Sequence, residues 1–338
     1  MTSLDTRGRE AILHIGTEKT GTTTLQHALA ESAATLDRSG FRYPQLGGGN
    51  THVALVAWAN DARNEADLPA LAGRHPGENR AAFDARIEEE LAREVAAHPD
   101  AIFIFSSEHA SSRLVHAQCI LRLKALLERH FDTIRICVYF RRWDRMAISA
   151  YSTFVQSGLA SPAPFRHFRD TSYLDYAALL GRWSGAFGHD RMHVAIFDRR
   201  ELAGGSIVSD FSSRFGLPPL QTREDANTSF DFKEVRTLAL INGLLADRAL
   251  PNAAAVRALI IAGFRKGGGP IPIEPDNARR FNAHYAAQAE AIRAQYFPKR
   301  RALFDEDYSG YQLPATPAAS NWRNAAEMLT DALHRAVS

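Results

Sequence analysis

The chain has 338 residues, enough to bury the core of one large α/β domain or of two small ones. Its formal net charge of +2 is too small to indicate the concentrated basic surface of a nucleic-acid-binding protein. The two cysteines, Cys119 and Cys137, both lie within apolar runs. We therefore expect no nucleic-acid partner, no disulfide framework and no metal centre.

The first ten residues contain no apolar stretch of the kind that a secretory signal has. No run in the chain approaches the roughly 20 apolar residues of a membrane-spanning helix. We therefore expect a cytoplasmic protein with no integral membrane segment.

Four short apolar runs predict β-strands, at residues 11–15, 101–105, 134–140 and 193–197. Continuous apolar runs are typical of strands that are covered on both faces, as in a parallel sheet. Segments with helical periodicity lie between them, at residues 22–34, 81–97, 115–130, 144–157 and 173–186. This alternation predicts an α/β fold with a central parallel sheet and crossover helices, which makes three layers.

The chain after about residue 233 is predicted to be mostly helical, with segments at residues 233–246, 252–263, 276–296 and 321–336. Residues 45–50 and 61–80 are predicted to be loops. We expect one domain over residues 1–338, with a core at about 9–232 and a helical portion at about 233–338 that covers the site.

The strongest motif lies at residues 11–26, where an apolar run ends at Gly16, a loop follows, and a helical segment begins at Thr22. A strand, a glycine-bounded loop and a helix in this order direct backbone N–H groups toward a phosphate. The motif nearly matches the nucleotide-triphosphate P-loop, Gly-x4-Gly-Lys-Ser/Thr. However, Thr22 occupies the position of the lysine, and Lys19 lies inside the loop.

The loop residues have the chemistry of a phosphate site. Thr20, Gly21, Thr22 and Thr23 offer amide and hydroxyl donors, and Lys19 offers a charge that can stabilise a leaving phosphate oxygen. The alternative for Lys19 is a solvated loop lysine. We find no acidic residue at a strand end that would be a magnesium ligand, so phosphate binding without a metal is favoured.

A second basic motif follows the run at residues 134–140. Arg141 stands at the end of this strand, a helix begins near Trp143 or Asp144, and Ser149 comes eight residues after Arg141, about two helical turns into it. The guanidinium and the hydroxyl could converge on a second anion. The alternative is a surface arginine and a serine inside a helix.

Together, the two motifs resemble the nucleotide signatures of sulfotransferases that use 3′-phosphoadenosine 5′-phosphosulfate (PAPS). In that family a Lys-x-Gly-Ser/Thr-Thr loop after the first strand binds the 5′-phosphosulfate, and residues 19–23 are similar to it. The family's 3′-phosphate segment has an arginine, a serine eight residues later and then an aromatic residue. Arg141, Ser149 and Tyr151 are similar to these three in type and spacing.

The opening motif at residues 14–23 looks most like the bacterial, carbohydrate-type branch of the family. The chain departs from the family at Arg142-Trp143, where Asp/Asn-Pro is frequent. The resemblance implies PAPS as donor, adenosine 3′,5′-bisphosphate as product, no metal, and a carbohydrate or glycolipid acceptor. It also implies that Ser149 restrains Lys19 until the acceptor arrives.

A late basic-glycine loop often closes the nucleotide site in this family. Arg265, Lys266 and Gly267 are similar to such a loop. Glycine lets backbone amides approach a phosphate closely. The alternative is a linker between two helices.

Transfer to a hydroxyl needs a base within hydrogen-bond reach of that hydroxyl. The run at residues 101–105 leads to Glu108 and His109 at the carboxyl edge of the predicted sheet, where ligands of parallel sheets gather. Glu108 is the first candidate, His109 the second and His52 the third. The alternatives are a local salt bridge for Glu108 and a structural role for His52.

The predicted function is therefore PAPS-dependent transfer of a sulfuryl group to a hydroxyl or amine of an acceptor. A P-loop kinase that uses ATP is a second enzyme class compatible with the loop. A nucleotide-binding module without catalysis is a third. Polysaccharide, glycolipid and small natural product remain open as acceptors, and the oligomeric state is not encoded in any motif.

Overall fold

The computed structural model describes residues 8–60, 75, 77–161, 163–222, 230–247, 252–264 and 271–312. The helix expected at residues 321–336 and the predicted ligands Arg265, Lys266 and Gly267 lie outside the described residues. The chain divides into two compact units. The first comprises Met1–Arg141 and Tyr176–Asp225, and the second comprises Arg142–Asp175 and Ala226–Ser338. The division expected near residue 233 stays a prediction.

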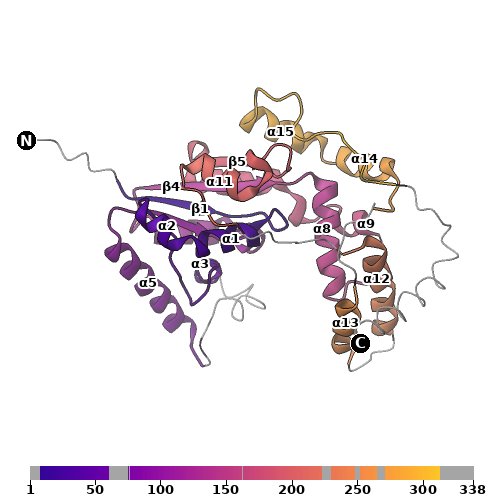
Figure 1. Cartoon of the computed structure of the whole chain (residues 1–338), viewed down its shortest axis with the longest axis horizontal. Helices are drawn as coiled ribbons and strands as arrows, with labels where there is room; N and C mark the ends of the chain where they lie inside the picture. The colour runs from indigo at the N-terminus through magenta and orange to yellow at the C-terminus, as the bar shows by residue number, and fades with distance from the viewer. Residues whose placement is uncertain are drawn as a thin grey trace, which may run out of the picture. The chain divides into compact units, whose positions relative to one another are not determined.

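The first unit is built on a five-stranded sheet in the order β2-β3-β1-β4-β5, with every neighbouring pair parallel. Figure 1 labels three of its strands, β1, β4 and β5. The strands are β1 (Glu10–His14), β2 (Phe41–Arg42), β3 (Ile102–Ser106), β4 (Thr133–Phe140) and β5 (Met192–Ile196). This sheet confirms the predicted α/β class with a central parallel sheet. The strand order changes direction at β1, which pairs with β3 on one side and β4 on the other.

Helices cover both faces of this sheet, which is why its strands are continuous apolar runs. One face shares its core with α1 (Thr22–Glu31), α2 (Ala33–Arg38) and α11 (Ile207–Phe215). Strand residues alternate between faces, so Phe140 lies on the other face, where its ring stacks on that of Tyr176 at 4.4 Å. The elements there include α3 (Val53–Ala59), α5 (Arg80–Ala97), α7 (Ala117–Leu127) and α10 (Tyr176–Phe187). The layered, P-loop-type fold follows from this arrangement.

The helix boundaries follow local chemistry. The side chain of Asn79 accepts a hydrogen bond from the Ala82 amide at 2.9 Å, which caps the start of α5. At α11, Ser206 caps the first turn and Gly216 ends the helix in the left-handed conformation, with φ 70°. The remaining short elements of this unit are α6 (His109–Arg113), η3 (His189–Arg191) and η4 (Ala203–Gly205).

Several elements of the first unit differ from the sequence predictions, and the short helices α6, η3 and η4 are among those that were not predicted. The helix predicted at residues 22–34 divides at Ser32 into α1 and α2. Strand β2 was not predicted, because two residues are too short to show a pattern. Helix α11 was not predicted either, although it contributes several residues to the core.

The second unit is helical. Its elements are α8 (Trp143–Gln156), α9 (Pro164–Phe168), η2 (Ser172–Leu174), α12 (Phe232–Asp247), α13 (Ala253–Ala262), α14 (Pro275–Ala283) and α15 (Ala286–Tyr296). Helix α8 packs against α9, α12, α13 and α14. The helix predicted at residues 276–296 is interrupted near Tyr285, between α14 and α15. No helix in the described part of the chain has the length and apolar character needed to cross a membrane.

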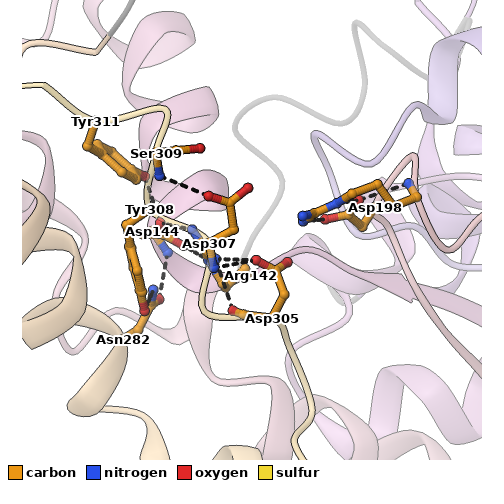
Figure 2. A network of polar contacts seen from close by, with 10 residues as sticks. Arg142, Asp144, Asp198, Asn282, Asp305, Asp307, Tyr308, Ser309 and Tyr311 are labelled. Carbon is orange, nitrogen blue, oxygen red and sulfur yellow. Dashed lines mark hydrogen bonds and ion pairs between the residues drawn. The ribbon is translucent and has the colours of Figure 1, made fainter.

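A largely buried cluster of ion pairs and hydrogen bonds connects the start of α8 with the segment at residues 305–311 (Figure 2). The Arg142 guanidinium donates to both carboxylate oxygens of Asp144, at 2.7 and 2.8 Å, and to Asp305 at 2.9 Å. Tyr311 donates to Asp144 at 2.7 Å, and Asn282 accepts the Asp144 backbone N–H at 3.0 Å. Burial opposes ionisation of Asp144, yet the hydrogen bond from Arg142 keeps the pKa of this carboxyl below its ordinary value. Arg142 therefore stabilises the packing of the second unit.

Candidate functional site

The predicted phosphate loop follows β1 and stays paired with β4 beyond the end of the strand. Ile15 donates its amide hydrogen to the Cys137 carbonyl at 2.9 Å, and Tyr139 donates to the Gly16 carbonyl at 2.8 Å. Thr17 donates to the Tyr139 carbonyl through its backbone N–H at 3.3 Å and its hydroxyl at 3.1 Å. The first half of the loop is thus an extension of the sheet, which fixes where the second half begins.

The loop turns through residues with positive φ. Gly16, Lys19 and Gly21 have φ values of 95°, 63° and 75°. A Cβ at Gly16 would lie 2.9 Å from the Glu108 Cα, and a Cβ at Gly21 would lie 3.1 Å from the Phe197 ring. Glycine is needed at both positions for the backbone conformation and for the close approach of a neighbour.

The start of α1 has the features of an anion-binding site. Gly21 precedes the helix and provides no side-chain cap, and the first turn contains no acidic residue. The first N–H groups of a helix have no partner within the helix, and its N-terminal end carries a partial positive charge. A phosphate oxygen would satisfy both the N–H groups and the dipole.

The three threonines predicted as phosphate ligands have different environments. Thr20 is fully buried and donates its hydroxyl hydrogen to the Thr17 carbonyl at 2.6 Å, so this hydroxyl stabilises the loop itself. Thr22 is buried at the first helical position, and Thr23 is exposed. Of the predicted ligands, Thr20 therefore offers its backbone amide to a phosphate rather than its hydroxyl.

Lys19 lies half-buried on this loop, next to groups of both signs. Burial lowers the pKa of Lys19 from its ordinary value, Glu18 and Glu108 oppose this shift, and the Arg141 charge adds to it. The Lys19 carbonyl accepts a hydrogen bond from the Arg141 Nη1 at 3.1 Å. Lys19, Arg141 and Glu108, all predicted from the sequence as site residues, thus lie at the same edge of the sheet.

Arg141 is held at the end of β4 by two aromatic residues of the first unit. The Tyr176 hydroxyl donates to the Arg141 carbonyl at 2.9 Å. The Arg141 guanidinium carbon lies 5.7 Å from the centroid of the Phe197 ring, a cation–π distance. The arginine therefore stands beside the loop at the strand-order switch, where ligands of open parallel sheets bind.

Glu108 follows β3 and forms the cap position of α6. Its Oε2 accepts a hydrogen bond from the Gln26 side-chain amide at 2.8 Å. His109 comes next along the chain, and its Nδ1 is buried with no hydrogen-bond partner among the described residues. Because β3 pairs with β1, Glu108 and Lys19 leave neighbouring strands at the same edge.

His52 is fully buried before α3. Its Nδ1 accepts the Ser106 amide hydrogen at 3.0 Å, and its Nε2 lies 2.9 Å from the Pro44 carbonyl, to which it donates. Burial lowers the pKa of His52 to about 4, so the ring is neutral at neutral pH. Both ring nitrogens are therefore engaged by the backbone.

Ser149 lies in the second unit, half-buried on α8. Tyr151, the aromatic residue of the same motif, is buried and donates its hydroxyl hydrogen to the Ser161 carbonyl at 2.9 Å. The helix that carries both residues begins at Trp143, as the sequence predicts. A role of Ser149 in nucleotide binding stays a prediction.

Two polar residues near this edge were not identified from the sequence. Gln26 interrupts the apolar face of α1, and a polar residue at a buried helical position is the signal that could have revealed it. Asp198 follows β5, so an acidic residue does stand at a strand end, contrary to the sequence-based expectation. Its two carboxylate oxygens accept hydrogen bonds from Arg200, at 3.0 and 2.7 Å. Over the described ranges, no group of three or more His, Cys, Asp or Glu side chains is arranged to hold a metal ion.

Comparisons with known proteins give few matches. No protein-family model matches the chain. An uncharacterized protein of Archaeoglobus fulgidus is 29% identical over 141 residues, and the match covers 38% of this chain and 38% of that relative's length. Among solved structures, a sulfotransferase domain from the curacin biosynthetic pathway aligns with 96% of this chain and 98% of its own, at 14% identity and a TM-score of 0.32.

Proposed function

We propose that this chain is a PAPS-dependent sulfotransferase that transfers a sulfuryl group to a hydroxyl or amine of its acceptor. One observation carries the proposal: Lys19 and Glu108 leave neighbouring strands at one sheet edge, and Arg141 holds the Lys19 carbonyl at 3.1 Å. A cation inside a phosphate loop and a carboxylate beside it are the two groups that an in-line transfer requires.

In the proposed reaction, the acceptor oxygen attacks the sulfur of PAPS opposite the bridging oxygen. A new S–O bond forms, and the bond between sulfur and the bridging oxygen breaks. Glu108 takes the proton of the acceptor hydroxyl. The bridging oxygen leaves with the electron pair as part of adenosine 3′,5′-bisphosphate, and the Lys19 ammonium stabilises its negative charge.

The chain's own groups fit the donor's anionic end. The uncapped start of α1 and the amides of residues 20–23 would bind the 5′-phosphate. The lowered pKa of Lys19 reflects its burial, and a charge out of water interacts more strongly with a nearby anion. From the family resemblance, Arg141 would bind the 3′-phosphate, and the nucleotide contacts that the resemblance implies for Ser149 and residues 265–267 stay predictions.

We assign the base role to Glu108, with His109 as the second candidate. The carboxylate of Glu108 has one oxygen bonded to Gln26 and lies close enough to Lys19 to affect its pKa. His52 is the weaker choice, because both of its nitrogens are bonded to backbone groups and its pKa is lowered to about 4. A carbohydrate or glycoconjugate is the first acceptor class to test, on the basis of the motif resemblance.

Nucleotide calorimetry distinguishes the proposal from its kinase alternative. We expect adenosine 3′,5′-bisphosphate to bind without added metal, and we expect Lys19→Ala to weaken this binding while the exposed control Lys299→Ala does not. If the protein bound ATP in the presence of magnesium and did not bind adenosine 3′,5′-bisphosphate, the kinase would become the better-supported function. Binding of the bisphosphate without turnover on any acceptor would indicate a non-catalytic module.

A further inference from the structure

Gln26 is a buried amide at a position where a helix usually presents an apolar side chain. Its side chain lies on the same face of α1 as Leu25 and Leu29, and the residue is only 2% exposed. Burying an amide is unfavourable unless its polar atoms find partners. The partners of Gln26 therefore explain why the position is polar.

The Gln26 Nε2 has three oxygen atoms within hydrogen-bond distance. It lies 2.8 Å from the Glu108 Oε2, 3.3 Å from the Ser106 Oγ and 3.4 Å from the Ser106 carbonyl. A carboxylate and a carbonyl only accept hydrogen bonds, so the nitrogen of the amide must face them. The contact with Glu108 is the shortest, and its acceptor is charged, which makes it the strongest of the three.

The side chains next to Gln26, those of Ser106 and His14, are fully buried and uncharged. The Ser106 hydroxyl lies 2.8 Å from the Nδ1 of His14, and the His14 ring contacts Tyr139 and Phe211 edge-on at 5.8 Å. Burial lowers the pKa of His14 to about 3, so the ring is neutral. The carboxylate of Glu108 is thus the single charge in the row His14, Ser106, Gln26, Glu108.

We propose that Gln26 is the positioning residue of the candidate base Glu108. Its amide fixes the Oε2 of the carboxylate, so that the Oε1 takes the proton of the acceptor. Gln26 belongs to α1, the helix whose first turn would bind the donor phosphate. One helix therefore sets the place of both the donor and the base. This inference rests on the proposed sulfotransferase function.

The test is a double-mutant cycle between Gln26 and Glu108, with kcat, KM and bisphosphate affinity as readouts. We expect Gln26→Met, which keeps the length and removes the donor, to lower kcat by about 10- to 100-fold and to leave the affinity for adenosine 3′,5′-bisphosphate unchanged. In the Glu108→Gln background, the same substitution should have little further effect, because Gln26 acts only through Glu108. Gln45→Met, at an exposed glutamine of the same unit, is the control.

A second variant adds a pH signature that a structural role would not produce. Gln26→Glu places a second carboxyl group beside Glu108, and the two share one proton at low pH. We expect kcat of this variant to fall as the pH rises and the shared proton is lost, with no such step in wild type or in Gln26→Met. Circular dichroism of each variant reports whether it is folded.

Two results would overturn the inference: an unchanged kcat in folded Gln26→Met, or a full, additive loss in the Glu108→Gln background. Failure of the proposed function has a different signature, since wild type would then neither bind adenosine 3′,5′-bisphosphate nor transfer sulfuryl. The contact also has a readout independent of activity. The side-chain amide proton resonances of Gln26 in wild type should shift on Glu108→Ala and remain in place in the Glu90→Ala control.

Discussion

At the scale of single residues, the site depends on how Lys19 is presented. Its left-handed backbone and the hydrogen bond from Arg141 to its carbonyl fix the direction in which its side chain leaves the loop. The neighbouring Glu108 offsets part of the effect of burial on the pKa of Lys19. The presentation of Lys19 therefore depends on its own backbone conformation, on the Arg141 hydrogen bond to its carbonyl and on the nearby charge of Glu108.

Arg141→Ala separates two roles of this arginine. If Arg141 binds the 3′-phosphate, the variant loses a charge-assisted hydrogen bond to this group. The binding free energy of adenosine 3′,5′-bisphosphate should then weaken by about 1.5–3 kcal/mol, and that of adenosine 5′-phosphate by much less. Calorimetry with both nucleotides measures the difference, and Arg38→Ala, at an exposed arginine, is the control. If both nucleotides lost the same binding free energy, Arg141 would not bind the 3′-phosphate, and its role would be the hydrogen bond to the Lys19 carbonyl.

Glu108→Gln keeps the shape of the side chain and removes its basicity. We expect kcat to fall by about 10²- to 10⁴-fold, the usual contribution of a general base, while nucleotide affinity is retained. Steady-state kinetics beside calorimetry measure both quantities. A normal kcat would transfer the base role to His109, which the corresponding His109→Gln variant examines.

At the scale of elements, the turn from the predicted phosphate loop into α1 would determine the geometry of the proposed donor site. Gly21 has φ 75° and approaches Phe197, whereas Gly40 has a similar φ of 79° and nothing within 4 Å of its would-be Cβ. Alanine at Gly40 would therefore test backbone strain alone, whereas alanine at Gly21 would test backbone strain together with crowding against Phe197. Phe197 also lies beneath the guanidinium of Arg141.

We expect Gly21→Ala and Gly40→Ala each to lose about 1–2 kcal/mol of unfolding free energy from the left-handed backbone. Only Gly21→Ala should also weaken nucleotide binding, because its methyl group displaces Phe197 beneath Arg141. Denaturant unfolding and calorimetry measure the two effects. Equal nucleotide affinity in both variants would show that the loop absorbs the methyl group without moving the site.

Comparison of the elements with the sequence shows which features of the fold local sequence patterns can predict. The four long strands were predictable because each is a continuous apolar run, and their ends shift by only one residue, as in Ile102–Ser106 against the predicted 101–105. The loop before α1 and the place of Arg141 at a strand end were predictable because each follows an apolar run, and their roles in phosphate binding stay predictions. The contact between Gln26 and Glu108 was not, since it joins residues 82 positions apart whose proximity depends on strand pairing.

At the scale of the whole molecule, two buried neutral histidines make stability depend on pH. The pKa of His14 is lowered to about 3 and that of His52 to about 4, against 6.5 in the unfolded chain. Between those values and 6.5 the unfolded state binds more protons, so the unfolding free energy falls as the pH falls. Burial lowers the pKa values of His130 and His193 as well, and this acts in the same direction.

Each of the two histidines should contribute a slope that approaches about 1.4 kcal/mol per pH unit at about one pH unit below 6.5. Denaturant unfolding between about pH 7.5 and pH 5 measures this, because carboxyl groups remain largely ionised in both states over that range. The slope of unfolding free energy against pH should be smaller in His52→Gln than in wild type. The slopes are compared, rather than the free energies themselves, because the substitution also changes packing. A pH-independent unfolding free energy would contradict the buried, neutral state of these rings.

If Lys19 and Glu108 form a sulfuryl-transfer site, the protein must transfer sulfuryl from PAPS in a reaction that depends on Lys19. The most direct measurement is transfer of radiolabelled sulfuryl from PAPS to a panel of polysaccharide, glycolipid and small hydroxyl acceptors, with wild type, Lys19→Ala and Lys299→Ala side by side. We expect a labelled product and an equal amount of adenosine 3′,5′-bisphosphate with wild type and Lys299→Ala, and a loss of transfer of at least about 10²-fold with Lys19→Ala. Undiminished transfer by Lys19→Ala, or phosphoryl transfer from ATP with no sulfuryl transfer by wild type, would contradict it.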